Sequence, residues 1–585
     1  MKIKVFNELQ TYPPIKQILV NRGIPENSLE TWINAGWPQI NSPYLFGKEK
    51  IKRALRLIHE SVLDNREIYV LVDCDADGFT SAALMINYLD KQYEEMVKDK
   101  IHYILHTGKQ HGLEDTVNQF PKNSLIILPD SSTNDVEQMR QLLNNNCYIV
   151  CLDHHEADHY LEDEDNLVII NNQICDYPNK DMSAAGIVWQ VCRALDQIMD
   201  TDYANDFIDL AALGCLSDMM NYRSIETRAI ISLGLNNIKN PFFYYMVEKN
   251  DFSIQKMGGI NYMSIAFYVT PFINAIVRSG TLEEKDLIFK SFLTKYAFEK
   301  IESGKRGHKG ELVPRVEEAI RIAANVKARQ TKLQDQSMAL LESRIRDYNL
   351  QDDAIIVLTC EPGEVEKNIA GLVANKIQAK YQHPTLVLTK SKTVEDKEPF
   401  YRGSARNYSM SENQDLRATC LETDLVEYAQ GHANAFGISI AESNIDSFIE
   451  KTNQLYEQVE KEPVYWVDFN WDYKNLNPNI ILDIAEAKDY WGQEIPEPYI
   501  AIHLTSIGNK VIQLLSPDKH PTIKIHLDNG IDIMKFKSSQ EEYEQFNNQN
   551  FSLIAVCRCA KNEWNGRVTA QLIIEDYFLQ KEWVF

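Results

Sequence analysis

The segment 68–78, IYVLVDCDADG, joins a short apolar run to three alternating aspartates and a glycine. A helical pattern, FTSAALMINYL at 79–89, follows it at once. A run of about five residues rich in Ile and Val, then polar residues, then a helix, is typical of a strand in a parallel sheet buried on both faces. Two more segments follow this order: SLIIL at 124–128 ends in PDSS, and YIVCL at 148–152 ends in DHHEAD.

The polar residues that close these runs predict one shared site. Open parallel sheets bind ligands beyond the carboxyl ends of their strands. A fourth apolar stretch, AALGCLSDMM at 211–220, also ends in an aspartate. We therefore expect four groups at one rim of one sheet: Asp73, Asp75 and Asp77; Asp130; Asp153, His154 and His155; and Asp218.

The chemistry of these groups favours divalent cations. Three neighbouring carboxylates repel one another, and leaving them unpaired near a sheet costs several kcal/mol. Because alternate residues after a strand point to opposite sides, the three aspartates of 73–77 should not share one role. Mixed carboxylate and imidazole ligands suit Mn²⁺ or Mg²⁺ better than structural zinc, and four such groups can hold two ions about 3.5 to 4 Å apart. The alternative is a solvated acidic turn; the spacing of a calcium loop is missing.

Composition limits the class of protein. The 585 residues suggest about three or four domains, and 44% hydrophobic with 25% charged residues is ordinary for a soluble globular chain. The net charge is −24, so a polyanion could be held only through a local basic surface or bound cations. The sequence has no apolar run of about 18 residues and no signal-peptide core, which predicts a cytoplasmic protein without a membrane segment. The ten cysteines form no CxxC pair and are expected to be reduced and buried.

The remaining pattern predicts several domains. Residues 1–66 indicate short helices, and 281–347 lack a strand signal and include a long exposed helix at 327–345. A second αβ pattern starts at AIIVL, 354–358, and short β-like runs from 463 onward predict a small barrel or sandwich. The expected bounds are 1–66 helical, 67–280 catalytic parallel-sheet α/β domain, 281–350 helical connector, 351–460 second α/β domain, and 461–585 β-barrel.

The motifs resemble a known family. DCDADG, LPDSS, DHH and the aspartate of ALGCLSDMM resemble motifs I to IV of the DHH phosphoesterase superfamily. The similarity extends along nearly the whole chain, in order, to the RecJ single-strand-specific DNA exonucleases. It rests on 15–34, HGLEDT (111–116), DMSAAGIVWQ (181–190), PFINAIVRSG (271–280), 366–389, GSARN (403–407), GHANAFG (431–437), 522–536 and 562–576. The resemblance implies a DHH domain, a DHH-associated substrate-binding domain and an OB-fold-like tail.

Residue roles implied by this resemblance follow position by position. Asp75, Asp77, Asp130, His154 and Asp218 match metal ligands, with Asp130 as the bridge between ions, and Asp73 matches an acidic position grouped with them. His155 matches a catalytic histidine at the scissile phosphate or leaving group. The predicted substrate-binding residues are Arg406, His432, Ser404 and Gly431 of the DHH-associated domain, with Asn274 and Arg278 lining the cleft. The chain departs from the family pattern at PDSS, where the aspartate is retained, and at Gln430, Phe436 and Ala275–Ser279. The bulkier residues at Phe436 and Ala275–Ser279 bear on substrate length or end preference rather than on the chemistry.

The resemblance implies a 5′-to-3′ exonuclease of single-stranded DNA that releases 5′-mononucleotides with two Mn²⁺ or Mg²⁺ ions. It further implies a monomer that acts in DNA repair or recombination, with a single-strand-binding protein or a helicase as possible partners. Two alternatives stay open: a DHH phosphodiesterase of short oligonucleotides or cyclic dinucleotides, and a non-catalytic RecJ-related replication scaffold. Scaffolds of that kind lose metal carboxylates, which this chain keeps. The basic cluster at 305–309 is interpreted either as a solvated loop or as a DNA-guiding loop.

Overall fold

A computed structural model describes residues 1–108, 110–308, 310–393, 396, 398–411, 413–457, 462–505, 511–547 and 551–581. The chain forms two compact units. Unit 1 comprises 1–17, 328–486 and 498–585, and unit 2 comprises 18–327 and 487–497. Helix α15, Arg315–Asp347, contributes residues to both units. The domain bounds expected from the sequence remain a prediction.

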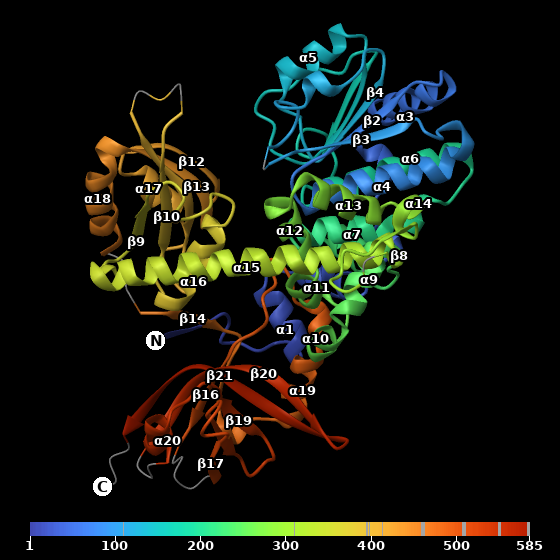
Figure 1. Ribbon diagram of the computed structural model, residues 1–585. Helices are drawn as coiled ribbons and strands as arrows, with labels where there is room; N and C mark the ends of the chain where they lie inside the picture. The colour runs from blue at the N-terminus through green and yellow to red at the C-terminus, as the bar shows by residue number, and fades with distance from the viewer. Residues whose placement is uncertain are drawn as a thin grey trace. The chain divides into compact units, whose positions relative to one another are not determined.

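Unit 2 contains a five-stranded parallel sheet of order β3-β2-β4-β5-β6 (Figure 1). The strands are β2 (Ile68–Val72), β3 (Ile101–Leu105), β4 (Leu125–Pro129), β5 (Tyr148–Asp153) and β6 (Leu167–Asn171). The chain passes from β2 to β3 on one side and then returns to β4 on the other side. The carboxyl ends of β2 and β4 therefore form the switch point where open α/β sheets bind ligands.

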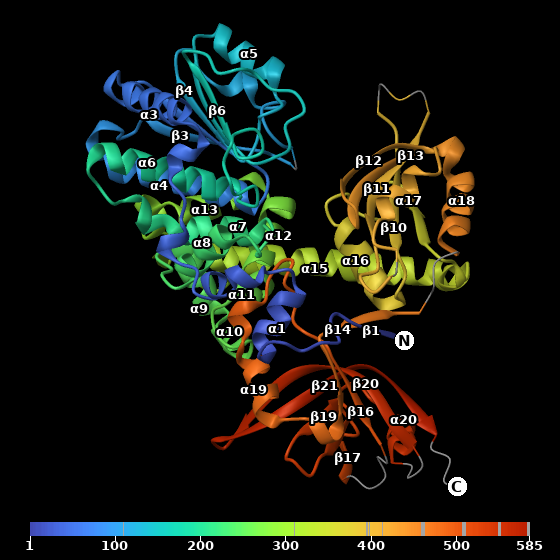
Figure 2. The ribbon, with the colours of Figure 1, turned by 180° about the vertical axis from the view of Figure 1, so that it is seen from behind.

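Both faces of this sheet are buried, which explains the unbroken apolar runs. Leu71, Ile126 and Cys151 belong to one apolar core with Met139 and Leu142 of α5, Val136–Asn144. The alternating residues of the same strands, such as Val70, Ile127 and Val150, are equally buried on the opposite face. Helices α3 (Lys48–Leu63), α4 (Ala76–Tyr93) and α6 (Ala184–Met199) contact the strands, as Figure 2 shows for α3 and α6.

The rest of unit 2 is mainly helical. It comprises α2 (Leu29–Ile33), α7 (Ile208–Ser217), α8 (Ile225–Leu235), α9 (Pro241–Lys249), α10 (Asp251–Lys256), α11 (Tyr262–Tyr268), α12 (Thr270–Ser279), α13 (Leu282–Phe292) and α14 (Thr294–Ala297). The expectation that 281–347 lacks strands is wrong, because β7 (Lys300–Glu302) and β8 (Leu312–Pro314) pair as a hairpin across the basic, glycine-rich segment. Such a short exposed pair carries no periodic apolar signal.

Unit 1 contains a mixed five-stranded sheet of order β12-β13-β11-β10-β9, of which Figure 2 labels β10 to β13. Strands β9 (Ile356–Cys360) and β10 (Thr385–Ser391) are parallel, whereas β11 (Phe400–Arg406), β12 (Val426–His432) and β13 (Ala435–Ala441) are antiparallel. Helix α16, Ala370–Tyr381, packs in one apolar core of this sheet, and α17 (Leu416–Leu421) and α18 (Ile445–Glu457) pack in the other.

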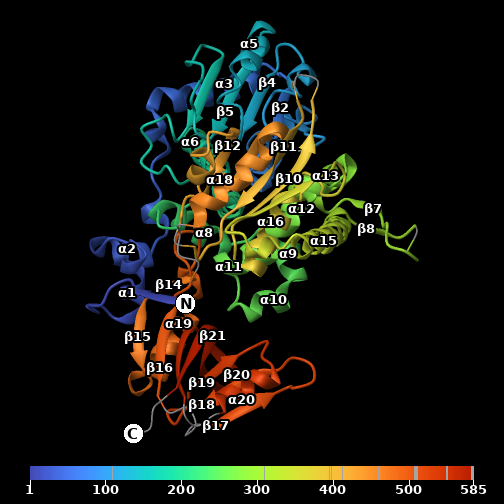
Figure 3. The same cartoon turned by 90° about the vertical axis from the view of Figure 1, so that its left-hand side faces the viewer.

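The C-terminal part of unit 1 is a seven-stranded sheet of order β15-β16-β20-β21-β19-β18-β17 (Figure 3). Its strands are β15 (Phe469–Asp472), β16 (Ile500–Leu504), β17 (Val511–Leu515), β18 (Thr522–His526), β19 (Asp532–Lys535), β20 (Phe551–Trp564) and β21 (Arg567–Lys581), with α19 (Pro478–Glu486) and α20 (Gln540–Phe546). Residues 1–66 are not purely helical: β1 (Lys2–Val5) pairs with β14 (Val464–Val467) ahead of α1 (Pro14–Asn21).

Two further expectations concern the whole chain. All ten cysteines are free and buried, as predicted. Among the described residues, no helix is long and apolar enough to cross a membrane.

Candidate metal centre

The first acidic motif occupies the junction between β2 and α4. Asp75 is the N-cap of α4, and its Oδ1 accepts a hydrogen bond from the Gly78 amide at 2.9 Å. The sequence analysis expected the three aspartates to alternate in direction as in a strand. Helix α4 starts at Ala76, however, so Asp77 lies in the first helical turn and does not follow that alternation. A Cβ at Gly78 would lie 2.7 Å from the Asp73 carbonyl oxygen, which explains the glycine at this tight turn.

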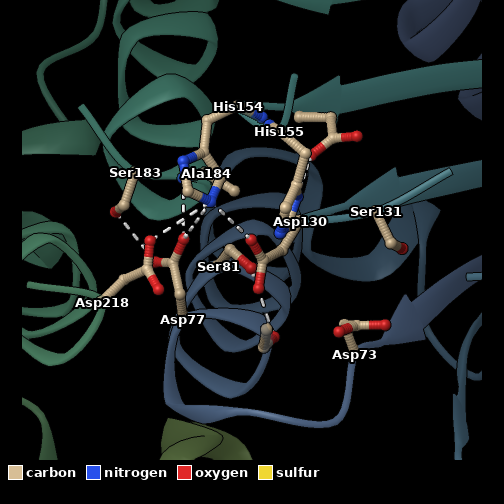
Figure 4. A network of polar contacts seen from close by, with 12 residues as sticks. Asp73, Asp77, Ser81, Asp130, Ser131, His154, His155, Ser183, Ala184 and Asp218 are labelled. Carbon is tan, nitrogen blue, oxygen red and sulfur yellow. Dashed lines mark hydrogen bonds and ion pairs between the residues drawn. The ribbon is translucent and has the colours of Figure 1, made fainter. Parts of the chain in front are cut away.

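Three of the predicted carboxylate ligands gather around the imidazole of His154, itself a predicted ligand (Figure 4). Its Nε2 lies 3.2 Å from Asp130 Oδ1, 3.4 Å from Asp218 Oδ2 and 4.0 Å from Asp77 Oδ2. Asp130 follows β4 with φ at 64°, a left-handed conformation that departs from the strand. An oxygen of Asp75 lies within 4.8 Å of oxygens of Asp73 and Asp130. The structure therefore brings all four motifs together.

Asp218 reaches this cluster from a helix and not from a strand end. Residues 211–217 belong to α7, a buried helix, and Asp218 is its C-cap. The expectation of a fourth strand end is wrong, because a short run of buried residues has no periodicity that separates helix from strand.

The amino terminus of α6 holds Asp77, a support that the sequence analysis did not assign. The Asp77 carboxylate accepts hydrogen bonds from Ser183 Oγ at 2.9 Å and from the amides of Ala184 at 2.7 Å and Ala185 at 3.2 Å. A Cβ at Gly214 would lie 2.2 Å from Asp77 Oδ1, so only glycine leaves room there. These donors belong to the stretch DMSAAG, residues 181–186. Its run of small residues at the start of a helix is the sequence signal that could have indicated a carboxylate-binding helix end.

Asp153, the first residue of DHH, orients both histidines. Its Oδ1 accepts the His154 amide at 2.7 Å and lies 2.8 Å from His155 Nδ1, and its Oδ2 accepts the Thr133 amide at 3.1 Å. The contact with Asp153 favours a proton on Nδ1 of His155, so that Nε2 is free of this contact and can interact with a ligand. The His155 side chain is 48% exposed, so this ring can meet a ligand from solvent.

Burial of like charges dominates the electrostatics. Burial, and then the charge of Asp75, raises the pKa of Asp77 to about 7. Burial and the neighbouring aspartates also raise the pKa of Asp130 and of Asp218 well above the usual range. Burial, and then His155, lowers the pKa of His154 to about 4, so this imidazole is neutral at pH 7 and can donate a lone pair.

The donors fit a divalent cation. Both carboxylate oxygens of Asp130 and Nε2 of His154 are buried and have no hydrogen-bond partner among the described residues. Asp130, His154 and His155 offer donor atoms within 4.8 Å of one another, as do Asp73, Asp75 and Asp130. Oxygen-rich ligand sets with one or two imidazoles suit Mn²⁺ and Mg²⁺.

The other predicted residues fall into two places. Asn274 and Arg278 lie on α12 of unit 2. Arg406 and Ser404 lie on β11, and Gly431 and His432 lie on β12 of unit 1. Arg406 and His432 both pair with Ala435 of β13, which puts the two side chains in one row across the sheet. Their roles stay a prediction.

Comparisons with known proteins agree with this architecture. The model of the DHH family N-terminal domain matches residues 67–215, and that of the RecJ OB domain matches 467–576. The chain is 30% identical over 585 residues, 98% of each chain, to a putative SPbeta prophage-derived single-strand DNA-specific exonuclease, YorK, of Bacillus subtilis strain 168. It is 22% identical to the single-stranded-DNA-specific exonuclease RecJ of that strain, over 98% of this chain and 69% of RecJ. The crystal structure of RecJ with Mn²⁺ from Thermus thermophilus matches with a TM-score of 0.70 at 17% identity, covering 100% of this chain and 80% of that one.

Proposed function

The chain belongs to the RecJ-like family of DHH proteins, and on that premise we propose that it degrades single-stranded DNA from the 5′ end, one nucleotide at a time. We place this hydrolysis in DNA repair or recombination. The proposed cofactors are two divalent cations, Mn²⁺ or Mg²⁺. The observation that carries the proposal is the group of buried metal-donor atoms on Asp130 and His154, which no described residue hydrogen-bonds and which further carboxylates surround.

Each residue of the cluster has a proposed role toward the cations. Asp75, Asp77, Asp130, His154 and Asp218 are the ligands, and Asp130 has two oxygens without a partner among the described residues, with which it can bridge two ions. When bound, divalent cations make water a nucleophile near neutral pH and offset the charge of a phosphodiester. Ser183 and the α6 amides keep Asp77 aimed at the cluster.

His155 is the proposed proton donor to the leaving oxygen. Burial alone would lower its pKa, but the hydrogen bond from Nδ1 to Asp153 raises the pKa to about 9. The ring is therefore protonated near pH 7 and can release a proton from Nε2. Its exposure is compatible with contact to a bound phosphodiester.

Substrate binding is assigned to the row formed by Arg406 and His432. A guanidinium can contact a phosphate through two parallel hydrogen bonds. Gly431 has φ at 125°, and the absence of a side chain there lets the backbone of β12 stay close to β13. Ser404 lies two residues before Arg406 on the same strand, so both side chains point to one face.

Digestion of end-labelled DNA tests the proposal. A long single strand is labelled at either end and incubated with Mn²⁺, and the products are compared with those from a matching duplex and from a dinucleotide. We expect mononucleotides released first from the 5′ end, with the duplex resistant. Preference for the dinucleotide would favour the oligonucleotide phosphodiesterase instead, and no hydrolysis of any substrate would favour the scaffold.

Variants connect activity to the cluster. Asp130→Asn and His154→Ala should each lower the rate at saturating Mn²⁺ by at least about 100-fold, because each removes a buried metal donor. The matched control is Glu164→Gln, an exposed carboxylate that pairs with Arg140 at 2.6 Å. Activity of either cluster variant within about tenfold of the parent contradicts the ligand assignment.

A further inference from the structure

A second group of potential metal donors joins Cys74 of the first motif to His111, and the proposed reaction uses neither residue. Cys74 Sγ is 3.5 Å from His111 Nε2, and the other ring nitrogen, Nδ1, is 2.6 Å from Asp73 Oδ2. Cys74 is buried in the turn after β2, whereas the His111 side chain is 55% exposed. Thiolate and imidazole are the donor pair that thiophilic cations prefer.

The distance between the two donors fits tetrahedral coordination. Zinc bonds of about 2.3 Å to sulfur and about 2.0 Å to nitrogen, at a tetrahedral angle, place the two donor atoms about 3.5 Å apart. Asp73 supplies the outer carboxylate that metal-binding histidines usually have, since it accepts from the nitrogen that points away from Cys74. The second Asp73 oxygen accepts the Gly112 amide at 3.1 Å, which fixes the carboxylate.

An independent observation comes from His106. This residue is 2% exposed, and its Nε2 has no hydrogen-bond partner among the described residues although it lies 3.7 Å from Asp73 Oδ1. Its Nδ1 contacts Asp115 at 3.0 Å. A buried ring nitrogen that no described residue hydrogen-bonds, facing the same carboxylate, is a polar atom for which a bound ligand could supply the partner.

The segment that carries both histidines is held by buried contacts. The ammonium group of Lys285, a buried residue of α13, donates to the carbonyl oxygens of His106 at 3.1 Å and Gly108 at 3.0 Å. The Leu113 amide donates to Asp135 at 2.8 Å. These contacts anchor the backbone on either side of His111, and a pre-ordered donor favours tight binding.

We propose that Cys74 and His111, oriented by Asp73, bind a thiophilic divalent cation such as Zn²⁺ at a thiolate site that is distinct from the Asp130–His154 centre and shares Asp73 with the carboxylate cluster. Cys74 lies between Asp73 and Asp75, so occupancy constrains the turn that carries Asp75. Zinc bound there inhibits turnover supported by Mn²⁺ or Mg²⁺. The binding site itself does not depend on the proposed function.

Cobalt substitution gives a readout that does not require activity. The full chain is saturated with Mg²⁺ and titrated with Co²⁺, and the near-ultraviolet charge-transfer band from thiolate to cobalt is followed. We expect the band to saturate at one equivalent of Co²⁺ and to disappear when Zn²⁺ is added. Absence of a band in the folded wild-type protein would overturn the proposal.

Four variants locate the site. Cys74→Ser should abolish the band, and Cys175→Ser, an equally buried cysteine, should keep it. His111→Asn, at an exposed position where folding is not at risk, should weaken Co²⁺ binding at least tenfold, and Asp130→Asn should leave the band intact. A band that survives both Cys74→Ser and His111→Asn, or is lost in Asp130→Asn, refutes a separate site. Nuclease assays on wild-type protein, run in parallel, distinguish this failure from failure of the proposed function.

Discussion

Replacing Asp130 with asparagine should stabilise the metal-free protein while removing its response to Mn²⁺. Oxygens of Asp73, Asp75 and Asp130 lie within 4.8 Å of one another, and Asp130 is almost fully buried. Two full charges 4.8 Å apart repel by about 3 kcal/mol at an effective dielectric constant near 20. Because burial and the neighbouring carboxylates raise the pKa of Asp130 well above its usual range, its charge is unfavourable in the folded state, and we expect a gain of about 1 to 3 kcal/mol in the free energy of unfolding at pH 8.

The stabilisation that Mn²⁺ provides should be smaller in Asp130→Asn than in the wild-type protein. A ligand at about 100 times its dissociation constant stabilises the folded state by about 2.7 kcal/mol. Wild-type protein should gain at least this much from saturating Mn²⁺, and Asp130→Asn should gain little, because the amide does not replace two anionic donors. Thermal unfolding in EDTA and in Mn²⁺ measures both effects as shifts of several degrees.

The control for this experiment is Glu164→Gln, which removes a surface carboxylate and should alter stability by less than about 1 kcal/mol with a normal Mn²⁺ response. Two outcomes refute the reasoning: an Asp130→Asn protein that is less stable than wild type in EDTA, or an equal Mn²⁺-induced stabilisation in both proteins. The first would mean that Asp130 is paired within the protein, and the second that it is not a ligand.

Four other predictions follow from the same geometry. In EDTA, the free energy of unfolding should fall as the pH rises from about 4 to 7, because folding raises the pKa of Asp77 from 3.8 to about 7 and the native state binds the extra proton between these values; urea unfolding of Asp77→Asn should show a flatter pH profile. Gly214→Ala should abolish Mn²⁺-induced stabilisation, since its methyl group meets Asp77 Oδ1, whereas Gly234→Ala, which meets Ala212 and the Ile208 carbonyl, should cost stability but keep the Mn²⁺ response in calorimetry. Asp153→Asn should lower turnover about 10- to 100-fold by releasing His155, and its rate–pH profile should shift to lower pH; an unchanged profile contradicts the role of Asp153. Arg406→Ala should weaken single-strand binding and reduce its salt slope by about one while Mn²⁺ binding stays normal; fluorescence anisotropy at several salt concentrations with unchanged affinity contradicts phosphate contact.

The ends of β2, β4 and β5 could be predicted because buried parallel strands have a clear apolar signature. Runs such as IYVLV and YIVCL have no charged residue on either face, and each ends directly in an acidic residue. Asp218 could be assigned to the site but not to its element, because α7 is buried on all sides and its apolar residues follow no helical stripe. The strands β3 and β6 were missed: β3 is only partly buried, and β6 ends in asparagines that gave no chemical signal.

The residues that support the site could not be predicted from local sequence. Ser183 and Ala184 contact Asp77 across more than a hundred residues of chain, and Gly214 is required only because three segments meet there. The contacts of His111 could not be predicted either, because the sequence analysis identified only the family-like segment HGLEDT to which this residue belongs. His111 contacts Asp73, 38 residues earlier in the chain, and the loop before it accepts hydrogen bonds from Lys285, a residue of α13 that no spacing rule connects to this loop.

A chain with a net charge of −24 can still bind a polyanion, because its clustered carboxylates repel one another at a place where a bound cation can neutralise them. Surface carboxylates would only repel DNA through screened, long-range potentials. The carboxylates of the buried Asp77 and Asp130 and of the partly exposed Asp218 instead have raised pKa values, which means that their charges are unfavourable in the folded protein. A divalent cation is the partner that offsets these charges, and it reverses the local field that a phosphodiester meets. If bound cations provide the affinity for DNA, EDTA should weaken binding to single strands far more in the wild-type protein than in Asp130→Asn. Equal losses of affinity in both proteins would instead assign the binding to basic residues of unit 1 such as Arg406.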